Sequence, residues 1–254
     1  MLSQRMISGR FYFNSTRQVI ASPSLGLHTS NLYAEYGFTN KFTAILFSPF
    51  LTLASRESGI DSNGTVFTAD KAIGFGDIDI GLKYGLLNKK LKLAASAFFG
   101  IPSGNYNGGS TGSLHLGDGE FNQMLKLDAS MGLAKGMFFT VFAGINNRTK
   151  QFSDEVHYGG EYGISKKNFT AILKVYARNS LFNEIRKDSP IPGIYSDNVE
   201  YLAISPQILY TFKGNIGIMG ELGFAVLGRN IIAAPSFNFG FYWKLEKSES
   251  KKQD

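Results

Sequence analysis

The chain lacks several residues and patterns on which common classes of protein depend. Its 254 residues include no cysteine, which excludes disulfides, thiolate metal sites and cysteine nucleophiles. No window offers about 18 consecutive apolar residues, so transmembrane helices are excluded as well. The net charge is +6, but neither a basic helix nor a nucleic-acid motif accompanies it. A solvated surface and a lysine-rich tail explain that charge, and we expect no nucleic-acid partner.

The chain is instead rich in the residues of strands and tight turns, with 22 Phe, 12 Tyr and 29 Gly. Its last strand-length stretch, residues 237–245, alternates apolar and wetter side chains almost without fault. Side chains of a β-strand point to opposite faces with a period of two, so this stretch has one apolar face. Similar patterns return about a dozen times over segments of about ten residues, which is the span of a tilted transmembrane strand.

The alternation predicts twelve strands joined by connections of two kinds. The predicted strands cover residues 2–13, 31–37, 42–51, 76–87, 91–100, 121–133, 137–148, 155–164, 169–178, 201–212, 216–227 and 237–245. Tight turns alternate with links that are mostly longer and rich in Gly, Ser, Asn and Asp, such as 14–30 and 52–75. Tight turns on one rim and long loops on the other are typical of bacterial outer-membrane barrels, whose turns are periplasmic.

These patterns predict an all-β fold: a closed antiparallel transmembrane β-barrel of about 12 strands, with short periplasmic turns and long extracellular loops. An unpaired backbone group is costly in hydrocarbon, so the sheet must close on itself. Residues 1–245 are expected to form this single domain, and 246–254 a short charged periplasmic tail. Strand-end aromatics are expected to form interfacial girdles, namely Tyr84, Tyr162, Tyr210, Phe212, Phe241 and Trp243.

The expected location is the outer membrane of a Gram-negative bacterium. Such a barrel is secreted, yet no apolar run of signal-peptide length follows Met1. We therefore expect either a mature chain or a start that omits part of the first strand.

The polar strand faces carry charged side chains that a barrel turns toward its lumen. The candidate pore-lining residues are Glu35, Asp77, Asp79, Lys83, Lys126, Asp128, Arg148, Glu155, His157, Glu161, Lys174, Arg178 and Glu221. One interpretation is a polar permeation path whose charges select solutes. The other is an interior network that fills and stiffens the barrel, because twelve strands lie between the small filled barrels and the wide porins.

Four segments, in their order and spacing, resemble a known family of outer-membrane transporters. The segments are residues 31–43 (NLYAEYGFTNKFT), 75–86 (FGDIDIGLKYGL), 117–121 (GDGEF) and 146–148 (NNR). The family carries the label "MetA pathway of phenol degradation", and the chain is most similar to its Bacteroidetes-type members over residues 2–245. The resemblance implies an outer-membrane β-barrel assigned to uptake of small or hydrophobic compounds. It also implies more strand before residue 2.

Other chemistries find less support. His28 and His115 are predicted in loops and His157 on a polar face, whereas a barrel lipase needs a lipid-facing His beside its serine. Asp118, Glu120, Asp154 and Glu155 cluster at the long-loop rim, where oxygen ligands can hold Ca²⁺, but they lack an EF-hand pattern and a structural role is favoured. Residues 100–119 are expected to form a flexible external loop or one folded into the pore. We expect no catalytic residue, no metal and no cofactor.

The predicted function is an outer-membrane channel or transporter for passive passage of small solutes, hydrophobic ones included. The first alternative is a plugged barrel that serves as a structural or accessory subunit of an envelope complex. The second is a membrane-embedded enzyme that modifies lipids. The expected partners are outer-membrane lipid and lipopolysaccharide, an unidentified small solute and, under the first alternative, an envelope complex.

Overall fold

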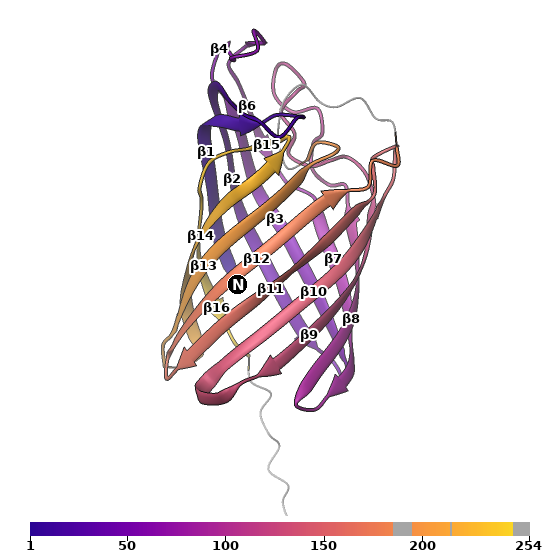
Figure 1. The fold of residues 1–254 in the computed structure, drawn as a ribbon, viewed down its shortest axis with the longest axis vertical. Coiled ribbons are helices and arrows are strands. Elements are labelled where there is room, and N and C mark those ends of the chain that lie inside the picture. Colours follow the sequence, from indigo (N-terminus) through magenta and orange to yellow (C-terminus); the bar gives the residue numbers. More distant parts are fainter. Residues whose placement is uncertain (185–194, 214, 246–254) are drawn as a thin grey trace, which may run out of the picture.

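A computed structural model describes residues 1–184, 195–213 and 215–245, which form a closed antiparallel barrel of twelve long strands (Figure 1). The wall strands are β1 (Leu2–Phe13), β2 (Val19–Gly37), β3 (Phe42–Arg56), β7 (Ile78–Asn88), β8 (Leu91–Ile101), β9 (Asn122–Gly132), β10 (Met137–Arg148), β11 (Glu155–Lys166), β12 (Phe169–Ser180), β13 (Glu200–Thr211), β14 (Ile216–Arg229) and β16 (Ser236–Trp243). Short strands β4 (Gly59–Ile60), β5 (Val66–Phe67), β6 (Asp70–Gly74) and β15 (Ile231–Ile232) lie at one end. No helix in the described ranges is long and apolar enough to cross a membrane.

The barrel closes where the first and last strands meet. β1 pairs with β2 on one side and with β16 on the other, from Leu2 opposite Phe241 to Ile7 opposite Ser236. The remaining wall strands pair antiparallel with their neighbours along the chain. Closure satisfies the backbone groups that hydrocarbon would leave unpaired, and the predicted closed barrel is confirmed.

The two ends of the barrel differ. At the turn end, β2–β3, β7–β8, β9–β10 and β11–β12 are joined by two to four residues, and one of these turns contains the short 3-10 helix η1 (Ala134–Gly136). At the loop end, links such as 57–77 and 102–121 are much longer (Figure 1). The predicted asymmetry of turns and loops is therefore present.

The outer surface is apolar because alternate residues of each strand face outward. Phe239, Phe241 and Trp243 are 54%, 68% and 66% exposed, whereas Asn238 and Tyr242, at alternate positions of the same strand, are 7% and 9% exposed. Five of the six predicted girdle aromatics are at least 42% exposed, and they lie toward the turn end: Tyr162, Tyr210, Phe212, Phe241 and Trp243. The sixth, Tyr84, packs on Phe42 with ring centroids 4.8 Å apart.

Two strands are longer than the sequence predicts. β2 begins at Val19 rather than Asn31, and β3 ends at Arg56 rather than Leu51. A bulge between them shifts the register at Ser30/Asn31, which breaks the alternation of the sequence pattern. His28 consequently lies within a strand rather than in a loop, which corrects the prediction.

The link between β8 and β9 folds over the loop-end mouth. Its Leu114 and Leu116 are 4% and 2% exposed and pack against Ala54 of β3 and Ala72 of β6. The Asp70 carboxylate accepts backbone hydrogen bonds from Ser110 and Thr111 of the same link, each 2.9 Å long. This glycine-rich segment is therefore packed against the loop-end strands, and its entry into the pore stays a prediction.

Candidate functional site

The turn-end half of the lumen holds charge pairs that water can reach. Lys83 Nζ lies 3.1 Å from Glu35 Oε1, with the two side chains 32% and 39% exposed inside the closed wall. Lys126 Nζ lies 2.9 Å from Asp128 Oδ1, and these side chains are 23% and 20% exposed. Exposure inside a closed barrel means that this half of the lumen contains space for water.

Glu221 of β14 joins three strands across the same half. Its carboxylate lies 2.9 Å from Lys174 Nζ of β12 and 3.4 Å from Arg5 Nη2 of β1, and it accepts a 3.0 Å hydrogen bond from Gln207 Nε2 of β13. Arg5 is a lumen charge that the sequence pattern missed, because β1 has the least regular alternation. Its register partner Asn238 is an inward-facing residue of β16, which fixes its face.

The loop-end half contains a buried cluster of side chains around one guanidinium group, the Arg148 cluster. The Arg148 side chain is 1% exposed, and its Nε lies 2.7 Å from Glu120 Oε1 while its Nη1 lies 2.8 Å from Glu155 Oε1. Asp118 Oδ2 lies 3.3 Å from Nη2. The guanidinium also stacks over Phe152, 4.2 Å from the ring centroid, and this ring is fully buried.

A second set of polar side chains extends the Arg148 cluster across β11 and β12. The Glu155 carboxylate is 1% exposed and pairs with Arg178 as well as with Arg148. His157 Nε2 lies 2.9 Å from Glu155 Oε2, and the other ring nitrogen contacts the Tyr176 hydroxyl. The charges are thus hydrogen-bonded on several sides, as buried charges require.

Asp77, in the link just before β7, anchors the folded β8–β9 link. Its carboxylate accepts a 2.8 Å hydrogen bond from the Gly104 N–H and a 2.7 Å bond from the Asp118 N–H. Burial, followed by the nearby Asp118 carboxylate, raises the pKa of Asp77 to about 7. This anchor is therefore half-protonated near neutral pH.

The structure places the thirteen candidate residues in two groups, one per half of the lumen. Two sets result: the water-accessible pairs are formed by Glu35, Lys83, Lys126, Asp128, Lys174 and Glu221, and the buried Arg148 cluster includes Arg148, Glu155, His157 and Arg178. Asp77 anchors the mouth, and Asp79 faces inward close to Gly100. Glu161 stands opposite Lys174 in the β11–β12 register, but the described residues show no ion pair for it.

The predicted rim cluster of carboxylates has a defined organisation. Asp118, Glu120 and Glu155 surround Arg148, while Asp154 Oδ1 accepts a 2.9 Å hydrogen bond from the Arg148 N–H. Within the described ranges, no three His, Cys, Asp or Glu side chains are grouped as metal ligands. Sequence reasoning placed these acids at one rim but missed Phe152, which looked like an ordinary loop residue.

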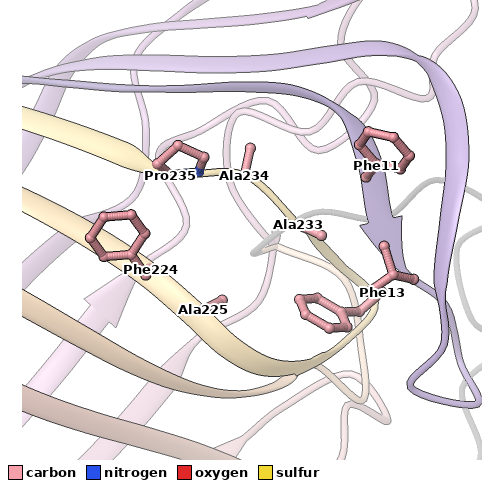
Figure 2. Close-up of a pocket in the computed structure, with 8 residues that line it drawn as sticks. Phe11, Phe13, Phe224, Ala225, Ala233, Ala234 and Pro235 are labelled. Carbon is pink, nitrogen blue, oxygen red and sulfur yellow. The ribbon is translucent and has the colours of Figure 1, made fainter.

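An apolar cavity of about 450 Å³ opens in the wall near the loop end (Figure 2). Phe11 and Phe224, on its outer side, are 51% and 41% exposed. Ala234, on its inner side, packs against the buried cluster of Tyr12, Leu25 and Ile232. The cavity thus reaches from the lipid face into the wall, and it is lined by Phe11, Phe13, Val19, Phe224, Ala225, Ala233, Ala234 and Pro235.

The cavity coincides with an interruption of the hydrogen-bond ladder. The β14–β16 ladder ends at Gly223 opposite Ser236, although β14 continues to Arg229. The segment 233–235 spans the interval between β16 and β15, where the Ala233 N–H donates to the Phe11 carbonyl at 2.9 Å. Pro235 has no N–H to donate, which favours a break at this point.

These features define the class of the protein as a β-barrel of the outer-membrane type, with water-accessible charge pairs toward the turn end, a buried ion-pair cluster toward the loop end and an apolar cavity in its wall. Residues 8–241 match the family described as "Putative MetA-pathway of phenol degradation", and the chain belongs to this family.

Two solved structures share the fold. The NanC porin is 12% identical with a TM-score of 0.59, over 96% of this chain and 100% of that chain. The COG4313 outer membrane channel from Pseudomonas putida F1 is 14% identical with a TM-score of 0.63, over 94% of this chain and 93% of that chain. At such identities the likeness establishes the fold alone. Among curated proteins, none matches the chain.

Proposed function

We propose that the protein is an outer-membrane channel that admits small apolar solutes through the wall cavity and releases them through the hydrated turn-end half of its lumen. The cavity is the observation that carries this proposal. Its eight lining residues are apolar, and it lies beside the interrupted β14–β16 ladder. The buried Arg148 cluster disfavours the alternative route straight down from the loop-end mouth, which supports entry through the wall.

The size of the cavity suits weak, transient binding. Its volume of about 450 Å³ falls within the range of small-ligand pockets. A small aromatic solute that buries on the order of 150 Å² of apolar surface gains roughly 4 kcal/mol relative to water. Binding of that strength favours uptake into the cavity without trapping the solute, as passage requires.

Filling the cavity tests the proposal. The assay follows a neutral aromatic dye that enters vesicles whose outer leaflet contains lipopolysaccharide, with and without the purified barrel. Wild type is expected to accelerate dye uptake, and Ala225→Trp to reduce the acceleration at least fivefold. The matched control is Ala129→Trp, at a position opposite the 40% exposed Val141 on the outer face of β9. Its uptake is expected to equal that of wild type.

The buried Arg148 cluster at the mouth also favours a second candidate, an accessory barrel that passes nothing. If folded wild-type protein leaves dye uptake at the level of protein-free vesicles, the channel proposal fails and the accessory role gains support. Uptake that is equal in Ala225→Trp and wild type would keep a channel but eliminate the wall cavity as its route.

A further inference from the structure

The outer surface of β1 and β2 carries four neighbouring polar residues, which we call the polar strip: Gln4, Ser8, His28 and Ser30. Gln4 pairs with the outward-facing Phe239 of β16 on one side and with Ser30 on the other, so both polar side chains face outward. Met6 likewise pairs with the outward-facing Phe237 and with His28. Ser8 follows Met6 at the period-two spacing of a strand. The polar strip therefore lies on the lipid-facing side of the wall.

Exposed apolar side chains surround the polar strip on every side. Along β1, the exposed Leu2 precedes the strip and the exposed Phe11 follows it. Across the strands, Phe239 of β16 lies beside Gln4, and the 45% exposed Leu51 of β3 pairs with Ser30. The strip is thus set within the apolar surface and not at its border.

The polar strip contains hydrogen-bonding groups that lack partners. The Ser30 hydroxyl donates to Gln4 Oε1, which leaves the Gln4 amide nitrogen with two N–H groups to donate. Within the part of the chain that the structure describes, this nitrogen, the Ser8 hydroxyl and the His28 ring nitrogens make no hydrogen bond. Hydrocarbon offers them no partner either, and each unsatisfied polar group there costs several kcal/mol. Contact with protein therefore suits the strip better than contact with lipid.

The composition of the polar strip suits a second copy of the same chain. Two copies that share one membrane orientation are related by an axis along the membrane normal, so each depth of one wall faces the same depth of the other. Amide, hydroxyl and imidazole groups offer both donors and acceptors, so the strip can pair with itself. It contains no Lys, Arg, Asp or Glu and therefore does not select a partner of opposite charge. Its serines are small, which lets two walls approach closely.

The available surface is large enough for a specific contact. The strip and its apolar rim extend over β16, β1, β2 and β3, which pair in this order. Four strands at about 4.8 Å spacing, over about ten residues of about 3.3 Å each, present roughly 600 Å² per copy. The total of roughly 1,200 Å² is at the lower end of specific interfaces. A contact of this size is typical of a reversible dimer.

We propose that the protein forms a two-fold dimer in the membrane through the polar strip. The Gln4 amide of one copy donates to oxygen atoms of the strip on the other copy, and the apolar rims pack around these hydrogen bonds. The dimer explains why polar groups without partners lie within an otherwise apolar surface. It concerns the outside of β1–β3 and does not depend on the proposed channel function.

The proposal is tested by counting barrels in liposomes at low protein density. The chain contains no cysteine, so Lys90→Cys in the β7–β8 turn attaches one dye to each barrel. Photobleaching of a spot in two steps then reports a dimer. The labelled barrel with an intact strip is expected to bleach mostly in two steps. Gln4→Leu/Ser30→Ala removes the polar groups, and Ser30→Trp holds the two walls apart. Each change is expected to lower the two-step fraction at least fivefold.

Ala143→Trp is the matched control. Ala143 is an exposed residue of β10, which is separated from β2 by β3, β7, β8 and β9, and its register partners Leu127 and Tyr158 are exposed as well. This variant is expected to keep the two-step fraction of the labelled barrel. Single-step bleaching of the barrel with an intact strip would overturn the proposal. An equal fall in Ala143→Trp, or an unchanged fraction in either strip variant, would also overturn it. If Ser30→Trp fails to fold, Gln4→Leu/Ser30→Ala decides alone.

Discussion

Replacing Arg148 with Met removes the cation at the centre of the buried cluster near the loop-end mouth. In the structure its guanidinium pairs with Glu120 at 2.7 Å and with Glu155 at 2.8 Å, and all three side chains are at most 1% exposed. Glu155 retains Arg178 and His157 after the change. Glu120 retains hydrogen bonds from Thr149 but loses its counter-charge, so it carries most of the penalty.

The magnitude follows from the burial of the charges. Removing one partner of a buried ion pair typically costs about 3–5 kcal/mol, because the other charge stays buried without compensation. Loss of the cation–π contact with Phe152 adds up to about 2 kcal/mol. We expect the segment 149–154 to be displaced, which relieves part of this cost by admitting water. The net fall in the free energy of unfolding is then about 3–5 kcal/mol.

Two measurements check this prediction, urea unfolding in detergent micelles and single-channel current in planar bilayers. Arg148→Met is expected to lower stability and to increase conductance, since the hydrated half of the lumen then connects to the mouth. Arg148→Met/Glu120→Gln is expected to recover stability but to stay conductive. Lys126→Met is the control, because its partner Asp128 is 20% exposed and its loss costs at most about 1 kcal/mol. A loss of stability under 1 kcal/mol with unchanged current in Arg148→Met would refute the reasoning.

Two further predictions concern protonation and lumen charge. Because the pKa of Asp77 is raised to about 7, its folded state binds the proton more tightly, and this contribution to stability is lost as pH rises from about 4 through 7. Limited proteolysis of residues 102–121 is expected to be faster at pH 8 than at pH 5. Asp77→Asn is expected to abolish this difference. An unchanged difference in the variant would show that protonation of Asp77 does not control the stability of this link. In the Arg148→Met background, Lys174→Gln removes one cation beside Glu221 and is expected to shift the reversal potential toward cation selectivity under a salt gradient. An unchanged potential would show that this pair does not line the ion path.

The sequence predicts the barrel wherever each face of a strand stays in a single environment along the length of the strand. In β16 the outward residues touch hydrocarbon and the inward ones the lumen, so period-two alternation shows both the strand and its orientation. The pattern fails for residues 19–30 and 52–56, which continue β2 and β3 toward the loop end. The outward positions in this part of β2 hold small or polar residues. Gly26, His28 and Ser30 therefore gave no hydrophobic signal.

The sequence predicts which charged side chains lie in the lumen, but it does not predict which of them pair with one another. Alternation places Lys174 and Glu221 on inward faces, yet their 2.9 Å contact depends on the curvature of a closed wall. The Arg148 cluster depends on the links 117–121 and 149–154 folding over it, which no periodicity describes. Phe152 and Glu120 are fully buried for that reason. The wall cavity was also missed, because it arises where a ladder stops rather than from a motif.

The proposed route through the wall cavity is tested most directly by finding where an apolar solute contacts the protein. A small photoreactive aromatic compound, activated in membranes that contain the wild-type barrel, can be mapped by mass spectrometry of the labelled peptides. We expect adducts at Phe224, Ala225 and residues 233–235, and we expect these adducts to be lost in Ala225→Trp. Adducts confined to the loop-end mouth around Phe152, with none at the wall cavity, would contradict the proposed route through the wall.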